Sequence, residues 1–158
     1  CAGMTFAQEA IKENEVPPEI REDFQYRFHE AKDILWLQQG DSYYGARFKL
    51  DGDLSEAVYT ADGQWIQTEE PITYRQMPDR ARDYCRSNYP EYSAKDVRKV
   101  STRKYGILYE IRIRKSQKQI GMTFDMNGKL LDENESEVEV QEEKGLKGKL
   151  GKLFKKKK

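Results

Sequence analysis

The stretch VYTADGQWIQTEEPI, residues 58–72, decides the fold, because a similar pattern returns as MTFDMNGKLLDENES at residues 122–136. Each stretch has an aromatic residue, then Asp-Gly or Asn-Gly, then large apolar residues. Asp-Gly and Asn-Gly pairs favour the tight turns that join antiparallel strands. The sequence therefore predicts two similar hairpins.

The similarity extends outward from these hairpins. Val16-Pro17 aligns with Met77-Pro78 at an offset of 61, and we continue this offset through Leu50 and Ile111. From Tyr59 onward the offset is 65. Because loop length costs little free energy, we expect the four-residue difference at the intervening hairpin tip. The pattern predicts a duplicated unit.

Each unit begins with a predicted helix. Pro17 and Pro78 suit a first helical turn, where a missing N–H costs nothing. Apolar residues then recur at i, i+4 and i+8, as Ile20, Phe24 and Phe28 in the first unit and Ala81, Cys85 and Tyr89 in the second. The spacing gives Cys85 a place in the core rather than a reactive or disulfide role.

Strands with alternating apolar residues follow each helix. The apolar positions are Tyr44, Ala46, Phe48 and Leu50, then Tyr105, Ile107, Tyr109, Ile111 and Ile113, then Ile120, Met122, Phe124 and Met126. This period of two indicates a sheet that is covered on one face only. We predict an α+β fold in which tandem α-β-β-β-β units form one continuous antiparallel sheet, backed by helices on one face, over one continuous core.

The expected organisation has four parts. They are an N-terminal tether (1–15), the first unit (16–76), the second unit (77–135) and an acidic then basic tail (136–158).

The composition of the chain argues against two classes of protein, those that bind nucleic acid and those that span a membrane. The formal net charge is zero, so no nucleic-acid partner is expected. No run of about 18 apolar residues occurs, so no membrane-spanning segment is predicted.

Cys1 at the start admits three interpretations. It carries a lipid after signal-peptide removal, it belongs to the remnant of an ordinary signal peptide, or it marks an arbitrary boundary. We favour lipidation at Cys1, and both of the first two interpretations place the protein in a bacterial envelope.

Candidate chemistry is sparse. Asp51, Asp53, Ser55 and Glu56 superficially suggest a calcium loop, but the glycine and the bidentate acid that such a loop needs are missing. His29, the single histidine, lies at a helix end beside Glu30, where a capping role is favoured over metal ligation. With no nucleophile, phosphate-loop or zinc motif present, we predict no enzyme, no cofactor and no metal.

The segments VPPEIREDFQYRFHEAKDILW, YYGARFKL and YTADGQWIQTEEPI resemble the PepSY-like, beta-lactamase-inhibitor-like family, and MPDRARDYCRSNYPEYSAKDVRKV with YEIRI and FDMNGKLL resembles the same pattern again. The resemblance covers about residues 16–135. It implies a tandem α+β layout in small secreted or lipid-anchored Bacteroidetes proteins whose open sheet face can bind protein. The resemblance assigns no catalytic residue to this chain, because the family pattern contains none.

Charge is distributed unevenly. Residues 41–72 hold seven acids and two bases, whereas residues 94–120 hold nine bases and two acids. We expect a bipolar sheet face that orients a partner, since complementary fields steer encounters. The predicted contact residues are Tyr43, Arg47, Arg112 and Arg114.

The tail ends in KGLKGKLGKLFKKKK. An amphipathic helix formed there on an anionic membrane would use Lys147, Lys149, Leu150, Lys152, Leu153 and Phe154. The alternative is a solubility tail that folds back on the acidic residues before it.

We therefore predict a non-enzymatic envelope protein, periplasmic or anchored to the outer membrane as a lipoprotein, that binds another envelope protein through its open sheet face, as an accessory subunit of a membrane complex. The alternatives are an inhibitor or regulator of a periplasmic peptidase or other hydrolase, and a binder of a small ligand or lipid surface.

Overall fold

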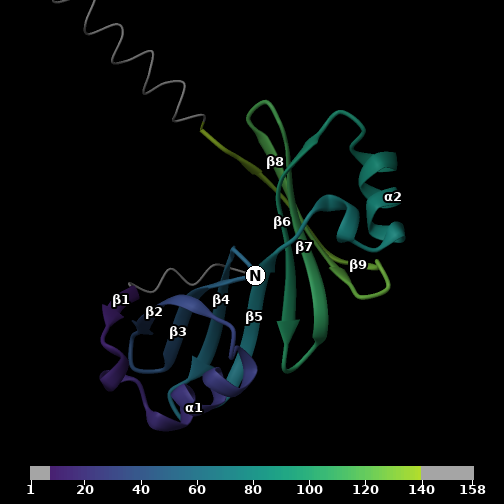
Figure 1. Cartoon of the computed structure of the whole chain (residues 1–158). Helices are drawn as coiled ribbons and strands as arrows, with labels where there is room; N and C mark the ends of the chain where they lie inside the picture. The colour runs from purple at the N-terminus through teal and green to yellow at the C-terminus, as the bar shows by residue number, and fades with distance from the viewer. Residues whose placement is uncertain (1–7, 140–158) are drawn as a thin grey trace, which may run out of the picture.

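The computed structural model describes residues 8–139, in which nine strands form one sheet with two α-helices against it (Figure 1). The strands are β1 Gln8–Ile11, β2 Lys32–Gln39, β3 Tyr43–Leu50, β4 Asp53–Thr60, β5 Trp65–Pro71, β6 Ser93–Thr102, β7 Gly106–Lys115, β8 Lys118–Asp125 and β9 Leu130–Glu137. Neighbouring strands follow chain order, and every pair is antiparallel. The predicted α+β fold with a continuous antiparallel sheet is confirmed.

The two halves have the same order of elements. In each half a three-residue 3-10 helix and a ten-residue α-helix precede four strands; the helices are Glu13–Glu15 with α1 Pro18–Arg27, and Tyr74–Gln76 with α2 Asp79–Asn88. Pro17 and Pro78 are the residues that cap these α-helices, one position before the first turn. Their ψ values of 138° and 142° are extended rather than helical, so each helix begins at the residue that follows the proline.

Both helices cover the same face of the sheet. Residues paired across an antiparallel ladder point to the same face, so the face can be followed from Ala57 to Thr68 and on to Ser101. Ala57 packs in the cluster beneath α1, and Val97, on the same side of β6 as Ser101, packs in the cluster beneath α2. We call the opposite side of the sheet the open face, because none of the helices in the described part of the chain lies on it.

The core is divided into two clusters, so the prediction of one continuous core is wrong. Phe24, Trp36, Phe48 and Tyr59 lie in the cluster under α1. The cluster under α2 contains Cys85, Val97, Ile111, Ile113, Met122 and Phe124.

Polar residues at the junction of the halves explain this division. On the helix-covered face, Thr68 of β5 pairs with Ser101 of β6, and Glu70 pairs with Lys99. Because hydroxyl, carboxylate and ammonium groups are costly to bury among apolar side chains, they interrupt the core where β5 meets β6. The sheet is therefore continuous through its backbone, while each helix has its own apolar cluster.

The four additional residues of the second half lie earlier than predicted. The turns at residues 40–42 and 103–105 have equal length, but β6 and β7 have ten residues each where β2 and β3 have eight. The register pairs Trp36 with Ala46, and Val97 with Ile111. The offset of 65 thus already holds at β3, so Ala46 corresponds to Ile111 rather than to Ile107.

The ends of two predicted strands also differ. Tyr105 and Met126 lie in turns and are 66% and 62% exposed, so neither continues the apolar face of its strand.

Part of the predicted tether joins the sheet as β1, where Ala10 pairs with Leu37. Strand β9 ends at Glu137, and the next residue, Val138, donates its backbone N–H to the Gln117 carbonyl at 2.8 Å. Cys1 and residues 140–158 lie outside the described range.

Between residues 8 and 139, no helix has the length and apolar character needed to cross a membrane.

Candidate functional site

Two neighbouring rows of polar side chains cross the open face from β6 to β9. The first row runs Arg98, Glu110, Thr123, Asp132, and the second runs Asp96, Arg112, Gly121, Asn134. Each row contains one residue from each of four strands, because the ladder places paired residues side by side. The rows bring together residues that are up to 38 positions apart in the sequence, such as Asp96 and Asn134.

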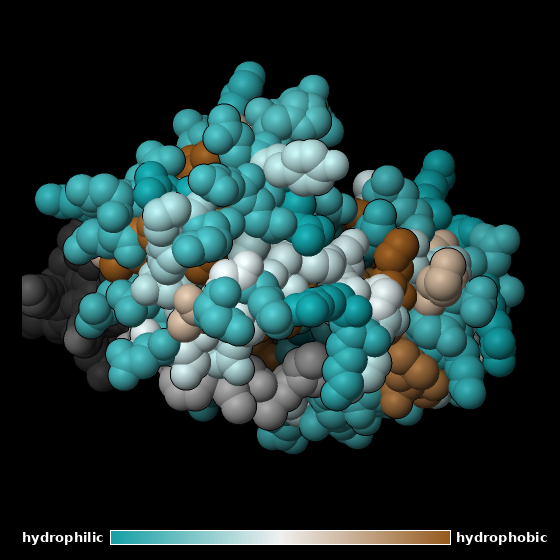
Figure 2. Space-filling model, turned by 90° about the horizontal axis from the view of Figure 1, so that it is seen from below, coloured by the Kyte–Doolittle hydropathy of each residue, from teal (hydrophilic) through white to brown (hydrophobic). Residues whose placement is uncertain are grey.

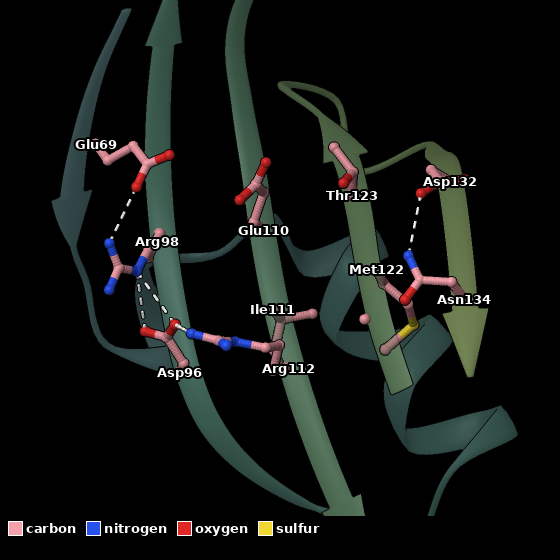
Figure 3. A pocket seen from close by; sticks show the side chains of 11 residues that line it. Glu69, Asp96, Arg98, Glu110, Ile111, Arg112, Met122, Thr123, Asp132 and Asn134 are labelled. Atoms are coloured by element: carbon pink, nitrogen blue, oxygen red, sulfur yellow. Dashed lines mark hydrogen bonds and ion pairs between the residues drawn. The ribbon is translucent and has the colours of Figure 1, made fainter. Parts of the chain in front are cut away.

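These rows line a groove of about 390 Å³, which we call the central groove (Figure 3). Its lining residues are Glu69, Asp96, Arg98, Glu110, Ile111, Arg112, Gly121, Met122, Thr123, Asp132 and Asn134. Gly121 contributes to its depth, because a residue without a side chain leaves room between Arg112 and Asn134. A Cβ atom placed there would lie 3.1 Å from Oδ1 of Asn134.

An ion-pair network occupies one side of the groove. Arg98 donates from Nη1 to Glu69 at 3.0 Å and from Nε to Asp96 at 3.1 Å. Arg112 donates to the same carboxylate of Asp96. Burial opposes ionisation of Asp96, but the bond from Arg112 and the charge of Arg98 outweigh it and lower the pKa of this carboxyl group. Both arginines are therefore engaged by acids of the protein itself.

Glu110 has no hydrogen-bond or ion-pair partner among residues 8–139. Its ladder neighbour Arg98 turns away from it toward Glu69 and Asp96, as Figure 3 shows. Burial is the main cause that raises the pKa of the half-buried Glu110 carboxyl group, and the charge of Glu69 adds to it. The sequence analysis did not single out this glutamate as a candidate site residue.

The four predicted contact residues all lie on the open face. Tyr43 is half-buried at the start of β3, where it pairs with Thr60. Arg47 donates from Nε to Glu56 at 3.1 Å and from Nη2 to Gln8 at 2.7 Å. Arg112 belongs to the central groove, and Arg114 donates to Gln119 at 3.1 Å.

The open face is not divided into an acidic and a basic half as expected. Glu56 and Glu69, acids of the first half, are each paired with an arginine. Asp51 and Asp62 lie in turns, and the ladder places Glu70 on the helix-covered face. The second half adds Asp96, Glu110 and Asp132 to its arginines, so opposite charges alternate across the strands.

The superficial calcium loop does not form a site. Asp51 lies in the turn between β3 and β4, Ser55 points into the helix-covered side, and Glu56 points to the open face. No group of three or more potential metal ligands occurs within residues 8–139. His29 is largely exposed, with Nε2 3.9 Å from Glu30.

Cys85 is a core residue, as predicted. It is 5% exposed, belongs to the cluster under α2, and burial raises the pKa of its thiol to about 11. A cleft of about 430 Å³ next to it is lined by Tyr74, Tyr89, Tyr92 and Ile113 among others. This cleft is where the small-ligand alternative would place its site.

The surface carries no large apolar patch in the direction that Figure 2 shows. Hydrophilic residues dominate that view, and hydrophobic atoms appear in small separate groups. The exposed large apolar residues likewise come from different elements, among them Tyr26 of α1, Leu54 of β4, and Tyr105 and Met126 in turns. The central groove is thus a polar and charged feature of a mainly polar surface.

Comparisons with solved structures identify the fold. A periplasmic protein from Bacteroides eggerthii superposes with a TM-score of 0.69 at 18% identity, over 76% of this chain and 88% of that one. A BLIP-like protein from Bacteroides fragilis gives a TM-score of 0.68 at 22% identity, over 77% and 86%. A DUF2874 family protein from Bacteroides ovatus gives 0.67 at 20% identity, over 75% and 86%. No curated protein has significant sequence similarity to the chain.

The family assignment rests on a sequence model. The model of the PepSY-like, beta-lactamase-inhibitor-like family matches residues 42–132, which is more than half of the chain and includes every strand from β3 to β8. The match agrees with the resemblance found in the sequence and with the antiparallel sheet carrying two helices. The chain belongs to the PepSY-like, beta-lactamase-inhibitor-like family.

Proposed function

We propose that this chain is a non-enzymatic protein-binding module of the bacterial envelope, and that its partner docks on the open face. The observation that carries the proposal is the placement of α1 and α2 on one side of the sheet. This placement leaves the polar rows and the central groove accessible on the other side.

The chemistry of the open face supports binding rather than catalysis. Three of its arginines, Arg47, Arg98 and Arg112, are held in ion pairs with acids of their own or a neighbouring strand, which gives a fixed pattern of charge that a partner can match. Catalytic acid–base work would instead need a nucleophile or a paired acid and base around a substrate site. The non-enzymatic role is part of the proposal.

A site-specific crosslink tests the face. A photo-reactive phenylalanine analogue replaces Tyr43 on the open face or, as the matched control, Tyr26, which is 86% exposed on α1. Full-length protein carrying either probe is irradiated in its native envelope, and adducts are identified by mass. We expect one abundant protein adduct from position 43 and none of that mass from position 26.

A charge reversal completes the test. Arg112→Glu together with Arg114→Glu is expected to abolish the adduct at position 43 while the circular dichroism spectrum stays unchanged. Equal adducts from positions 43 and 26, or an adduct that survives the reversal, would show that the open face is not the docking surface.

Inhibition of a hydrolase is the second candidate function, and the family description favours it. It predicts that the protein, titrated against β-lactamases and periplasmic peptidases, reduces one target's activity to a stoichiometric endpoint. The accessory-subunit role predicts an adduct with a protein whose activity does not change on titration.

The location and the anchors are also proposals. The description of the Bacteroides eggerthii protein as periplasmic supports a place in the envelope. Lipidation at Cys1 predicts incorporation of labelled fatty acid that Cys1→Ala abolishes. Binding of the basic tail to anionic membranes predicts sedimentation with anionic vesicles that is lost when residues 145–158 are deleted.

A further inference from the structure

The central groove has a charge surplus that its own residues do not neutralise. Its lining contains four carboxylates, from Glu69, Asp96, Glu110 and Asp132, against the two guanidinium groups of Arg98 and Arg112. Glu69 and Asp96 are the acids that those arginines bind. The remaining two negative charges belong to Glu110 and Asp132.

These two acids lie in one row with Thr123 between them. Glu110 pairs with Thr123 across β7 and β8, and Thr123 pairs with Asp132 across β8 and β9. Two strand spacings separate their backbones, which is roughly 10 Å. Asp132 accepts a bond from the side-chain amide of Asn134 at 3.3 Å, a neutral donor that leaves its charge in place.

The space between the acids suits one long cationic side chain. Gly121 opens the groove in the neighbouring row, and the Thr123 hydroxyl offers an acceptor at its centre. A guanidinium group has five N–H donors in a rigid plane, so two of its edges can each donate to a different carboxylate, whereas the ammonium of lysine is a compact point charge without this fork.

We propose that the central groove binds an arginine side chain presented by the partner protein, which inserts over Thr123 and bridges the carboxylates of Glu110 and Asp132. This inference rests on the proposed function of the open face and specifies the chemistry of the partner. The groove thereby recognises a basic residue on a protruding loop of its target.

The charges around Glu110 agree with this role. Arg98 on β6 and Arg112 on β7 face it but are bound to Asp96 and Glu69, and Asp132 on β9 adds a second negative charge. Burial and the charge of Glu69 on β5 raise the pKa of Glu110, so its carboxylate is held at a cost that a bound cation would offset. Binding is therefore expected to strengthen as pH rises through the titration of Glu110.

A peptide titration tests the inference directly. Isotope-labelled full-length protein is titrated with acetyl-Gly-Arg-Gly-amide at pH 7, and the backbone amide shifts are followed by NMR. The matched control peptide has citrulline in place of arginine, which keeps the shape and removes the charge. We expect saturable shifts at Gly121, Thr123 and Asp132 with the arginine peptide only.

Variants locate the effect. Glu110→Gln and Asp132→Asn are each expected to weaken the peptide about tenfold, as the loss of one charge-assisted hydrogen bond implies. The control Glu135→Gln removes an exposed acid from the same strand but on the other side, since Glu135 pairs with the core residue Ile120, and should leave binding unchanged.

Three outcomes would overturn the proposal. The first is equal amide shifts with the citrulline peptide, and the second is peptide binding that Glu110→Gln does not weaken. The third is a calcium chloride titration in which the same amides shift with a lower dissociation constant than that of the peptide. The two proposals fail separately. An adduct at position 43 without peptide binding would refute the arginine site and leave the docking proposal standing. Peptide binding without an adduct would refute the protein-docking role.

Discussion

Gly63 and Gly128 occupy the same place in the two halves, in turns that touch the first residues of the helices. Both have a positive φ, at +96° and +80°, which residues other than glycine adopt only at a cost in free energy. A Cβ atom at Gly63 would lie 3.3 Å from the Glu19 side chain. At Gly128 it would lie 2.8 Å from the backbone nitrogen of Ala81, which cannot move without shifting α2.

Gly128→Ala should therefore destabilise the protein by about 2–4 kcal/mol, from backbone strain together with the contact to α2. The matched control is Gly52→Ala, because Gly52 has φ +84° but no neighbour within 4 Å, so only the backbone strain of about 1–2 kcal/mol applies. Urea denaturation measures both. Equal losses would show that the contact with the helix costs nothing.

Glu110→Gln should make the protein more stable at neutral pH. The folded-state pKa of Glu110 lies above its ordinary value of 4.5, so its contribution to stability is greatest below pH 4.5 and is lost as pH rises through the folded pKa. The variant has no such loss. The difference in melting temperature between variant and wild type should shrink as pH falls toward 4.5, and a difference independent of pH would contradict the burial of this charge.

The two helices are elements of equal length with different packing. Phe24 of α1 contacts Phe28, Trp36 and Phe48 with ring centroids about 5 Å apart. The corresponding residue of α2 is Cys85, in a cluster of smaller side chains. Aromatic rings therefore surround Phe24 at the centre of α1, whereas α2 has a buried thiol in that place and, within residues 8–139, a single ring contact to the sheet, from Tyr84 to Phe124 at 5.9 Å.

The thiol of Cys85 should react only when α2 leaves the sheet. With Cys1 replaced by serine, the native protein is expected to react with an aromatic disulfide reagent at pH 8 at least about a hundredfold more slowly than in urea, because burial removes access and the raised pKa leaves little thiolate. Absorbance of the released thiolate measures the rate. Native and unfolded rates of similar size would place Cys85 at the surface.

At the scale of the whole molecule, the sheet joins two apolar clusters that do not touch through a shared core. The backbone ladder between β5 and β6 spans five residue pairs, compared with nine between β6 and β7. Local opening follows the packing of side chains, so each half is expected to respond to its own core mutations. The open face and its central groove depend mainly on the second half.

Phe24→Ala tests this separation. The loss of a buried aromatic ring should cost about 3–5 kcal/mol and lower hydrogen-exchange protection mainly in α1 and β2–β4. The reciprocal variant Ile111→Ala should lower protection mainly in α2 and β6–β8. A uniform loss of protection across residues 8–139 in either variant would mean that the halves unfold as one unit.

The open face would recognise a partner over several strands. The ion pairs and acids on this face can give specificity through the placement of charge. The groove, the ion pairs beside it and the unpaired acids all lie within β5–β9. A partner that binds this region would contact residues from five strands at once.

Local patterns in the sequence were sufficient for the elements and their faces. The Asp-Gly and Asn-Gly turns, the helical spacing around Phe24 and Cys85, and the alternation along β3, β7 and β8 each depend on residues close in the chain. The same locality explains an error. An offset of 61 or 65 differs by four, an even number, so every side chain keeps its face and the pattern cannot reveal which strand contains the extra residues.

Tertiary structure alone decided the site and the division of the core. Glu110 looked like one more outward-facing acid, and its lack of a partner depends on the pairing of Arg98 with Glu69 on β5 and with Asp96 on its own strand. The groove needs Gly121 beside Arg112, and the core divides because Thr68 meets Ser101. Such pairings follow from register between distant segments, whereas the sequence by itself determines only which face of its own strand each residue occupies.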